Sequence, residues 1–372
     1  MIVNRKQNPW NSKYMRNTLT LLLLLAVTSI SAQSKKFIIE ELNLPEPAQT
    51  ISNSNYNTIK LQDIRVDPDD YGIVMKGVSD RKAKVKFNPS LEEQLSSMFD
   101  KGIDKSSARD QELLIQLRSL NYKEVTIDMV QYGYFNFRAL IFGGKENEYQ
   151  LIKKIDTTMV LFKMDVTKKL EEQSLDYLHK TVFEAVSATP IDNRIYTQED
   201  INNYDKIAKS QLPLYTQPKL KDGVYMNYTS FSAQVPDKPI DEIQVNLGMI
   251  TKVTYIDDKG KKKNAKTQSY AVVYQGKAYI LYEGELYPTR KTPEDFYFIS
   301  KIYDRPTGER QLLSGITGGM IGGPIGGVIG VLIAKGKSKT YECQLDYFNG
   351  KYMIVREIKP QKQNEVYHLN EE

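Results

Sequence analysis

The sequence is poor in the residues that carry most catalytic and metal chemistry. Its 372 residues include one cysteine, Cys343, and two histidines, His179 and His368. One cysteine cannot close an internal disulfide, and two isolated histidines do not match the ligand spacing of a zinc site. Walker, nucleophile-elbow and HExxH motifs are also absent from the sequence. We therefore expect a protein that is not an enzyme and that holds no metal or cofactor.

Two short acidic segments leave a secreted hydrolase that uses carboxylates as an alternative. They are residues 67–70, which read DPDD, and the pair Asp257-Asp258. A calcium loop needs carboxylates at alternating positions before a glycine, and DPDDYG meets only half of that pattern. Both segments separate apolar runs, so we interpret them first as polar turns. A weak metal site and a catalytic pair are the other interpretations.

The first 33 residues have the pattern of a secretory signal peptide. Four basic residues precede an apolar core that ends at Ile30, and Ser31-Ala32-Gln33 supplies a small residue at the expected cleavage site. The core is about 12 residues long, short of the ~20 that span a bilayer, although an uncleaved anchor is an alternative. We expect an exported protein, either periplasmic or associated with a membrane of the cell envelope.

Most of the net positive charge belongs to that segment. Of the formal charge of +5, residues 1–33 carry +4, which leaves +1 for residues 34–372. Nucleic-acid binding depends on a clustered basic surface that neutralises phosphates. We therefore expect no nucleic-acid partner.

A run of 24 residues, Gln311 to Ala334, contains no charged side chain and eight glycines. Small residues four apart line one face of a helix and allow close backbone approach, as in helices that pack inside membranes. The run predicts membrane association or self-association. The residues expected to carry it are Gly315, Gly318, Gly319, Gly322, Gly323, Gly326, Gly327, Gly330, Ile321, Ile325, Ile329 and Leu332.

We expect this run to form a hairpin, because it interrupts a series of predicted strands that belong to one sheet. Gly322-Gly323-Pro324 lies at its centre, where a turn is needed. Each arm has about 10 residues, or ~15 Å as helix, which is half of a ~30 Å hydrocarbon core. Packing in water against the same chain or another subunit, and a flexible insert, are the alternatives. Lipid headgroup contacts are expected after the run, at Lys335, Lys337 and Lys339.

The remaining chain is expected to be α+β. After a flexible lead-in at 34–57, residues 58–190 read β-β-β-α-β-β-β-α, with a helix from Asn88 as cap to Gly102 and a second from Asp165. This pattern predicts a two-layer α/β sandwich. A linker at 191–219 follows, with one short helix capped by Thr197 and Asp200.

Residues 220–358 are expected to form a mostly antiparallel β domain that the glycine-rich hairpin at 311–334 interrupts. Two turns, YQGK at 274–277 and FNGK at 348–351, stand between apolar runs and are typical of β-hairpins. The strand expectations are 243–247, 249–256, 270–274, 278–282, 296–303 and 340–348. Residues 359–372 are expected to be a polar tail.

Two resemblances accompany these patterns. The leucine-rich core that ends in Ser31-Ala32-Gln33 resembles export signals common in Bacteroidota, and with the glycine-zipper run the chain resembles uncharacterised exported envelope proteins of that type. The order of elements in 58–190 resembles small envelope-assembly proteins of the outer-membrane accessory lipoprotein type. Together they imply a non-enzymatic envelope protein that contacts a membrane, itself or an unknown envelope partner. A subunit of an oligomeric membrane pore is a further alternative.

Overall fold

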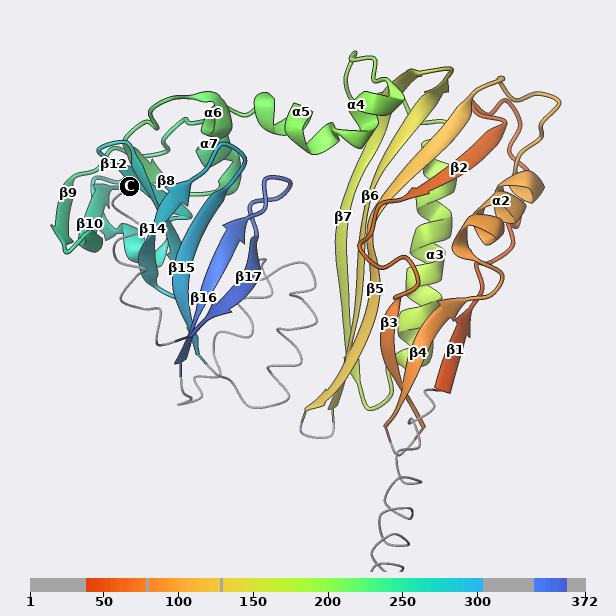
Figure 1. Ribbon diagram of the computed structural model, residues 1–372, viewed down its shortest axis with the longest axis horizontal. Coiled ribbons are helices and arrows are strands. Elements are labelled where there is room, and N and C mark those ends of the chain that lie inside the picture. Colours follow the sequence, from red (N-terminus) through yellow and green to blue (C-terminus); the bar gives the residue numbers. More distant parts are fainter. Residues whose placement is uncertain (1–37, 78–79, 128–129, 304–337, 360–372) are drawn as a thin grey trace, which may run out of the picture.

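The computed structural model describes residues 38–77, 80–127, 130–303 and 338–359. Helix makes up 20% of it and strand 47%, in mostly antiparallel sheets, so the protein belongs to the mixed α+β class. Figure 1 shows two β-rich units joined by a short helical connector that contains α4 and α5. The segments at 1–33 and 311–334 and most of the tail at 359–372 lie outside the described residues.

The N-terminal unit is built on one seven-stranded sheet. Its strand order is β1-β4-β3-β5-β6-β7, and β2 pairs with the N-terminal part of β5. The strands are β1 (Ile38–Leu42), β2 (Thr58–Asp63), β3 (Gly72–Lys76), β4 (Arg81–Phe87), β5 (Glu112–Ile127), β6 (Val130–Lys145) and β7 (Glu148–Lys163).

Two helices pack against this sheet, α2 (Leu91–Gly102) and α3 (Thr167–Ala185). Their apolar residues share one hydrophobic core with alternate residues of the strands, including Val85, Leu117 and Phe135. From Thr58 to Ala185 the observed order β-β-β-α-β-β-β-α agrees with the prediction from sequence.

The cap of α2 differs from the prediction. Ser90, not Asn88, is the N-cap: its hydroxyl accepts from the Glu93 backbone N–H, and the Glu93 carboxylate accepts from the Ser90 N–H. This reciprocal capping box needs an acceptor three residues after the cap, and Glu93 stands at that spacing from Ser90 but not from Asn88. The predicted end at Gly102 is confirmed.

The segment predicted as a flexible lead-in contributes an ordered strand. β1 pairs with β4 in parallel, from Ile38↔Ala83 to Leu42↔Phe87, and Leu42 is buried. The expectation of flexibility was wrong because the proline and asparagine content of 43–57 masked a short edge strand before it. Parallel pairing with a strand about 45 residues away leaves no local turn signal.

The connector between the units contains three short helices rather than the predicted one. They are α4 (Gln198–Asn202), α5 (Tyr204–Ser210) and α6 (Pro213–Thr216). The predicted capping box of Thr197 and Asp200 is confirmed at the start of α4. Tyr196, Ile201 and Tyr204 pack on Leu114, Leu140 and Phe142, on the face of the sheet opposite α3.

The C-terminal unit contains a seven-stranded sheet in the order β17-β16-β15-β14-β13-β12-β8 and a three-stranded sheet in the order β11-β10-β9, with antiparallel pairing throughout. A short helix, α7 (Tyr228–Ser232), and a 3-10 turn, η1 (Ala265–Thr267), connect them. The strands are β8 (Gly223–Tyr225), β9 (Glu242–Asn246), β10 (Met249–Ile256), β11 (Lys262–Asn264), β12 (Ala271–Tyr274), β13 (Lys277–Tyr282), β14 (Glu285–Lys291), β15 (Phe296–Tyr303), β16 (Ser338–Leu345) and β17 (Tyr352–Ile358).

Turn chemistry explains the hairpins that the sequence indicated. Gln275 and Gly276 join β12 to β13 with φ of 53° and 78°, and Asn349-Gly350 lies between β16 and β17. Glu146 and Asn147, with φ of 53° and 70°, join β6 to β7. Two consecutive positive φ values match the right-handed twist of paired strands.

Candidate functional site

The glycine-rich run is attached between two paired strands. β15 and β16 are antiparallel neighbours with an unbroken register from Tyr297↔Gln344 to Tyr303↔Ser338. The last described residue before the run and the first after it are therefore directly opposite each other. Paired residues of antiparallel strands have Cα atoms about 4.5–5.5 Å apart. The chain leaves the sheet and returns to it at one point.

The predicted association residues lie between those two points, outside the described residues: Gly315, Gly318, Gly319, Gly322, Gly323, Gly326, Gly327, Gly330, Ile321, Ile325, Ile329, Leu332, Lys335 and Lys337. Lys339, the third predicted headgroup contact, is described. It lies exposed on β16, and its Nζ is 2.8 Å from Oε2 of Glu357 on β17. Exposed pairs of this kind contribute little to stability.

The strands that hold the run are fixed by a buried interior. Phe296, Phe298 and Ile302 of β15 are buried with Leu345 and Tyr352 in one cluster. Cys343 lies 3.5 Å from the Ser300 hydroxyl, and burial raises the pKa of its thiol to about 11. A thiol held protonated in this way is a poor nucleophile, so Cys343 acts as a small core residue.

The turn between β16 and β17 docks on the N-terminal sheet. Arg138 of β6 donates from Nη2 to Oδ2 of Asp346 at 2.6 Å and from Nε to Oδ1 of Asp156 at 3.1 Å. Asn349 donates to the other oxygen of Asp156. Burial raises the pKa of Asp346, and the Arg138 charge opposes that rise. The turn thus couples the strands that hold the run to the other unit.

Aromatic contacts surround this ionic centre. Two cations lie over the Phe348 ring. Cζ of Arg138 is 5.0 Å from the ring centroid, and Nζ of Lys154 is 4.7 Å from it. The Tyr347 hydroxyl donates to Oδ1 of Asp205 at 2.7 Å, and the same carboxylate pairs with Arg118 of β5. No sequence pattern marked these residues, because their contacts depend on how the two units meet.

A buried carboxyl group that the sequence analysis did not single out lies beneath the start of α3. Glu124 of β5 is 2% exposed, and its Oε2 accepts from the Met75 N–H at 2.7 Å and the Thr167 hydroxyl at 2.8 Å. Its Oε1 is buried and makes no hydrogen bond to the described residues. Burial raises the pKa of Glu124 to about 7. The alternation Leu120, Tyr122, Glu124 is the signal that could have placed this acid on the core face.

A second carboxyl group belongs to Glu171, which lies on α3 one helical turn after Thr167. Glu171 lies 3.5 Å from Nζ of Lys76, which also pairs with Glu40 of β1. Burial raises the pKa of Glu171 to about 7, and the Lys76 charge opposes that rise. These groups can change charge near neutral pH, but they lie between α3 and the sheet and line no described cleft.

The acidic segments predicted as turns are held by their own chain. Arg65 donates to both oxygens of Asp63 and to the carbonyl of Asp70, so the 67–70 loop wraps around one guanidinium. Asp257 accepts from the backbone N–H groups of Lys259 and Lys261 in the β10–β11 turn. Within the described ranges, no three His, Cys, Asp or Glu residues are grouped as metal ligands.

His179 on α3 is half-buried. Its Nε2 is buried without a hydrogen-bond partner among the described residues, and its ring lies 4.6 Å from that of Phe183. Burial lowers its pKa, which favours the neutral imidazole. The other histidine, His368, lies outside the described residues.

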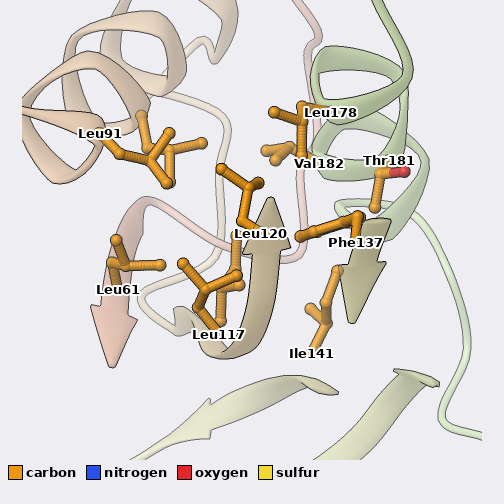
Figure 2. A pocket seen from close by; sticks show the side chains of 11 residues that line it. Leu61, Leu91, Leu117, Leu120, Phe137, Ile141, Leu178, Thr181 and Val182 are labelled. Carbon is orange, nitrogen blue, oxygen red and sulfur yellow. The ribbon is translucent and has the colours of Figure 1, made fainter. Parts of the chain in front are cut away.

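A small apolar cavity lies between α2, α3 and the sheet. Figure 2 shows side chains of both helices and of β2, β5 and β6 pointing into it, including Leu91, Leu117, Phe137 and Leu178. Its volume of about 20 Å³ is close to that of one water molecule, and its lining is almost wholly apolar. We interpret it as an imperfection of core packing rather than a ligand site.

Comparisons with known proteins add little to this geometry. No family model matches the chain, and no curated protein matches it. A crystal structure of protein XCC0632 from Xanthomonas campestris, assigned to the family model DUF330, aligns with 39% of this chain and 92% of its own. The identity is 12% and the TM-score 0.26, values too low to carry an argument. Within the described ranges, no helix is long and apolar enough to cross a membrane.

Proposed function

We propose that this protein is a non-enzymatic component of the cell envelope that uses its glycine-rich run as an anchor. The supporting observation is the pairing of Tyr303 with Ser338. The two ends of the run leave the sheet from paired positions on neighbouring strands. In this proposal, the run must therefore return to the same side of the membrane from which it came. A single straight pass through a bilayer would separate β15 from β16.

The proposed anchor is a hairpin that dips into a membrane or pairs with the same hairpin of a second copy. Its apolar side chains, such as Ile321, Ile325 and Ile329, would face lipid while the glycines pack together. The signal-like segment at 1–33 supports export before insertion. In this proposal, the N-terminal unit is a two-layer α/β sandwich that presents a binding surface to an envelope partner.

The experiment is fractionation of the full chain and of a variant that lacks residues 312–334, followed by a carbonate wash of the membranes. We expect the full chain to stay in the membrane pellet and the deletion variant to become soluble. Two soluble, monodisperse proteins would refute anchoring and indicate that the run packs within the molecule.

Two substitutions test the close packing of the glycines. We expect Gly322→Leu and Gly326→Leu each to release the protein from membranes or to dissociate its oligomer, because a branched side chain holds the two backbones apart. Ile316→Leu, which keeps volume and apolar character within the run, is the matched control. Detergent-resistant oligomers of the full chain would favour an oligomeric pore over a simple anchor.

A further inference from the structure

The two halves of α3 contact the sheet in different ways. The C-terminal half packs through apolar side chains such as Leu178 and Val182, which belong to the hydrophobic core. The N-terminal half also turns a polar stripe toward the sheet, made of Thr167, Glu171 and Ser174 at helical spacing. Figure 1 shows this half of α3 beside β3. The attachment of the first turns of α3 therefore depends on the protonation and pairing of polar groups.

Thr167 contacts two oxygens but has one proton to donate. Its hydroxyl oxygen lies 2.8 Å from the Met75 carbonyl oxygen and 2.8 Å from Oε2 of Glu124. When Glu124 is neutral, its carboxyl proton can serve one contact while the hydroxyl donates in the other, and both become hydrogen bonds. When Glu124 is ionised, one contact is left without a proton. This geometry favours the protonated carboxyl group.

The surroundings of Glu124 also favour its neutral form. Its Oε1 is buried without a hydrogen bond to the described residues, so a charge on this group would be poorly compensated. Burial is the main cause that raises its pKa, and the hydrogen bonds from Met75 and Thr167 oppose the rise. Of the nearby charged groups, Asp165 before α3 raises the pKa further and Lys76 of β3 lowers it.

Lys76 serves two carboxyl groups on different elements. Its Nζ lies 2.5 Å from Oε1 of Glu40 on β1 and 3.5 Å from Oε1 of Glu171 on α3. The two carboxyl side chains are 19% and 16% exposed. Burial raises the pKa of Glu171, the charge of Lys76 opposes the rise, and Glu40 adds to it. From β5, the Tyr122 phenol faces Glu171, and burial keeps that phenol neutral by raising its pKa. One lysine balances one carboxylate, so ionisation of Glu171 leaves a net negative charge.

The strand β1 is the element that this charge would loosen most easily. It has five residues, and its pairing within the described ranges is with β4. Glu40 and Leu42 are the side chains of β1 that contact Lys76 and the core. An ionised Glu171 competes with Glu40 for Lys76 and repels it. Elements held by few contacts open locally before the rest of a fold.

We infer that Glu124, Glu171 and Lys76 form a proton-controlled latch. While both carboxyl groups carry protons, the latch holds β1 and the N-terminal half of α3 on the sheet, and ionisation of the carboxyl groups loosens both elements. Local opening is therefore rare at acidic pH and becomes more frequent as the pH rises through the pKa of about 7. The inference goes beyond the proposed function and depends on neither a membrane nor the glycine-rich run.

The test is hydrogen–deuterium exchange of the full chain at pH 6 and pH 8, expressed as protection factors so that the intrinsic pH dependence of exchange cancels. The variant is Glu171→Gln. The matched control is Glu172→Gln, which removes the exposed acid at the next position of α3, where it pairs with Lys169. The central strands β5 and β6 are the internal reference, and circular dichroism establishes that each variant folds.

We expect the protection of β1 and of the first two turns of α3 to fall between pH 6 and pH 8 by about tenfold for each of the two carboxyl groups, because each binds its proton more tightly in the closed state. The protection of β5 and β6 should change less. Glu171→Gln should raise the protection of β1 and α3 at pH 8 toward its value at pH 6. A side chain with a merely structural role would give the opposite result, a lower protection at both pH values.

Three results would overturn the inference. They are a fall of wild-type size in Glu171→Gln, an equal rescue at pH 8 by Glu172→Gln, and a parallel fall in β5 and β6. The last would mean that the whole unit unfolds rather than that a latch opens. Glu124→Gln provides an independent variant, because its amide keeps an oxygen for the Met75 N–H and cannot ionise. It should also reduce the fall by about tenfold, and an unchanged fall there would remove Glu124 from the latch.

Discussion

Arg138 and Asp346 form an ion pair at 2.6 Å although they lie 208 positions apart in the chain. Arg138 belongs to the N-terminal sheet, and Asp346 begins the turn that links β16 to β17. The side chains are 15% and 3% exposed. This pair is the ionic centre of the contact between the two units, and Asp346 directly follows β16, the strand that the chain enters after the glycine-rich run.

Breaking this pair should destabilise the protein far more than breaking an exposed one. Removal of one partner of a buried pair commonly costs about 3–5 kcal/mol. Arg138 keeps its pair with Asp156 when Asp346 is removed, so we expect the lower end of that range. We expect Asp346→Ala to lower the free energy of unfolding by about 3 kcal/mol in urea denaturation. Lys339→Ala, which removes the exposed pair with Glu357, should cost less than about 1 kcal/mol. Equal losses would show that Arg138 is satisfied without Asp346.

Stability should fall as the pH rises from about 5 to 8, because of Glu124. Its pKa is near 4.5 when the chain is unfolded and about 7 when folded, so the folded state binds the proton more tightly. The resulting stabilisation is complete below the unfolded pKa and is lost as the pH rises through 7. The difference corresponds to at most about 3 kcal/mol. Glu171 contributes in the same direction.

Glu124→Gln is the variant that tests this titration. A neutral amide keeps an oxygen for the Met75 and Thr167 donors and cannot ionise, so the decline in melting temperature between pH 5.5 and 8 should be shallower. Glu93→Gln, an exposed acid whose pKa is lowered by Ser90, should leave that part of the profile unchanged. A wild-type slope in Glu124→Gln would assign the pH dependence to other groups.

Gly72 and Gly77 form a matched pair for backbone substitution. Both have positive φ, 94° and 70°, but a Cβ at Gly72 would lie 1.9 Å from the Tyr122 carbonyl oxygen, and one at Gly77 would meet nothing within 4 Å. Gly77→Ala should therefore cost about 1 kcal/mol of left-handed strain. Gly72→Ala should cost clearly more, since β3 must move away from β5. Similar melting temperatures for the two variants would contradict the close approach.

Deletion of residues 312–334 should leave the rest of the fold intact. The ends of the run are held by seven registered pairs of β15 and β16, so a shorter connection can close the same hairpin. We expect the variant to keep its circular dichroism spectrum and to melt within a few degrees of the full chain. A large loss of stability would show that the run packs against the described residues and contributes to their core.

Local chemistry explains which elements the sequence predicted. The turn at Gln275-Gly276 and the capping box at Thr197 are encoded within four residues, and each is present. Asn349-Gly350 also lies between two strands, but in a longer turn in which the Asp346 N–H donates to the Lys351 carbonyl. The strand β14 was missed because Pro288 lowers the strand signal of 285–291, although the residue pairs with Tyr279 near the middle of the sheet. The strand β1 was missed because its partner β4 is distant in sequence.

The sites depend more strongly on distant contacts. The spacing of Thr167 and Glu171 is visible in the sequence, but only the packing of α3 on the sheet brings Lys76 beside Glu171. Nothing near Arg138 marks Asp346 as its partner. Of the predicted association residues, only Lys339 lies among the described residues, so the proposed anchor still rests on the composition of its sequence and on the position of its two ends.

The direct opposition of Tyr303 and Ser338 also makes the intervening segment replaceable. A protein core tolerates any loop whose ends meet at the spacing of paired strands, and the entropic cost of a longer loop grows only slowly with its length. Evolution can therefore lengthen, shorten or exchange this segment as a cassette while the surrounding sheet stays the same. A sheet with the same β15–β16 pair accepts insertions of different length and composition at this point.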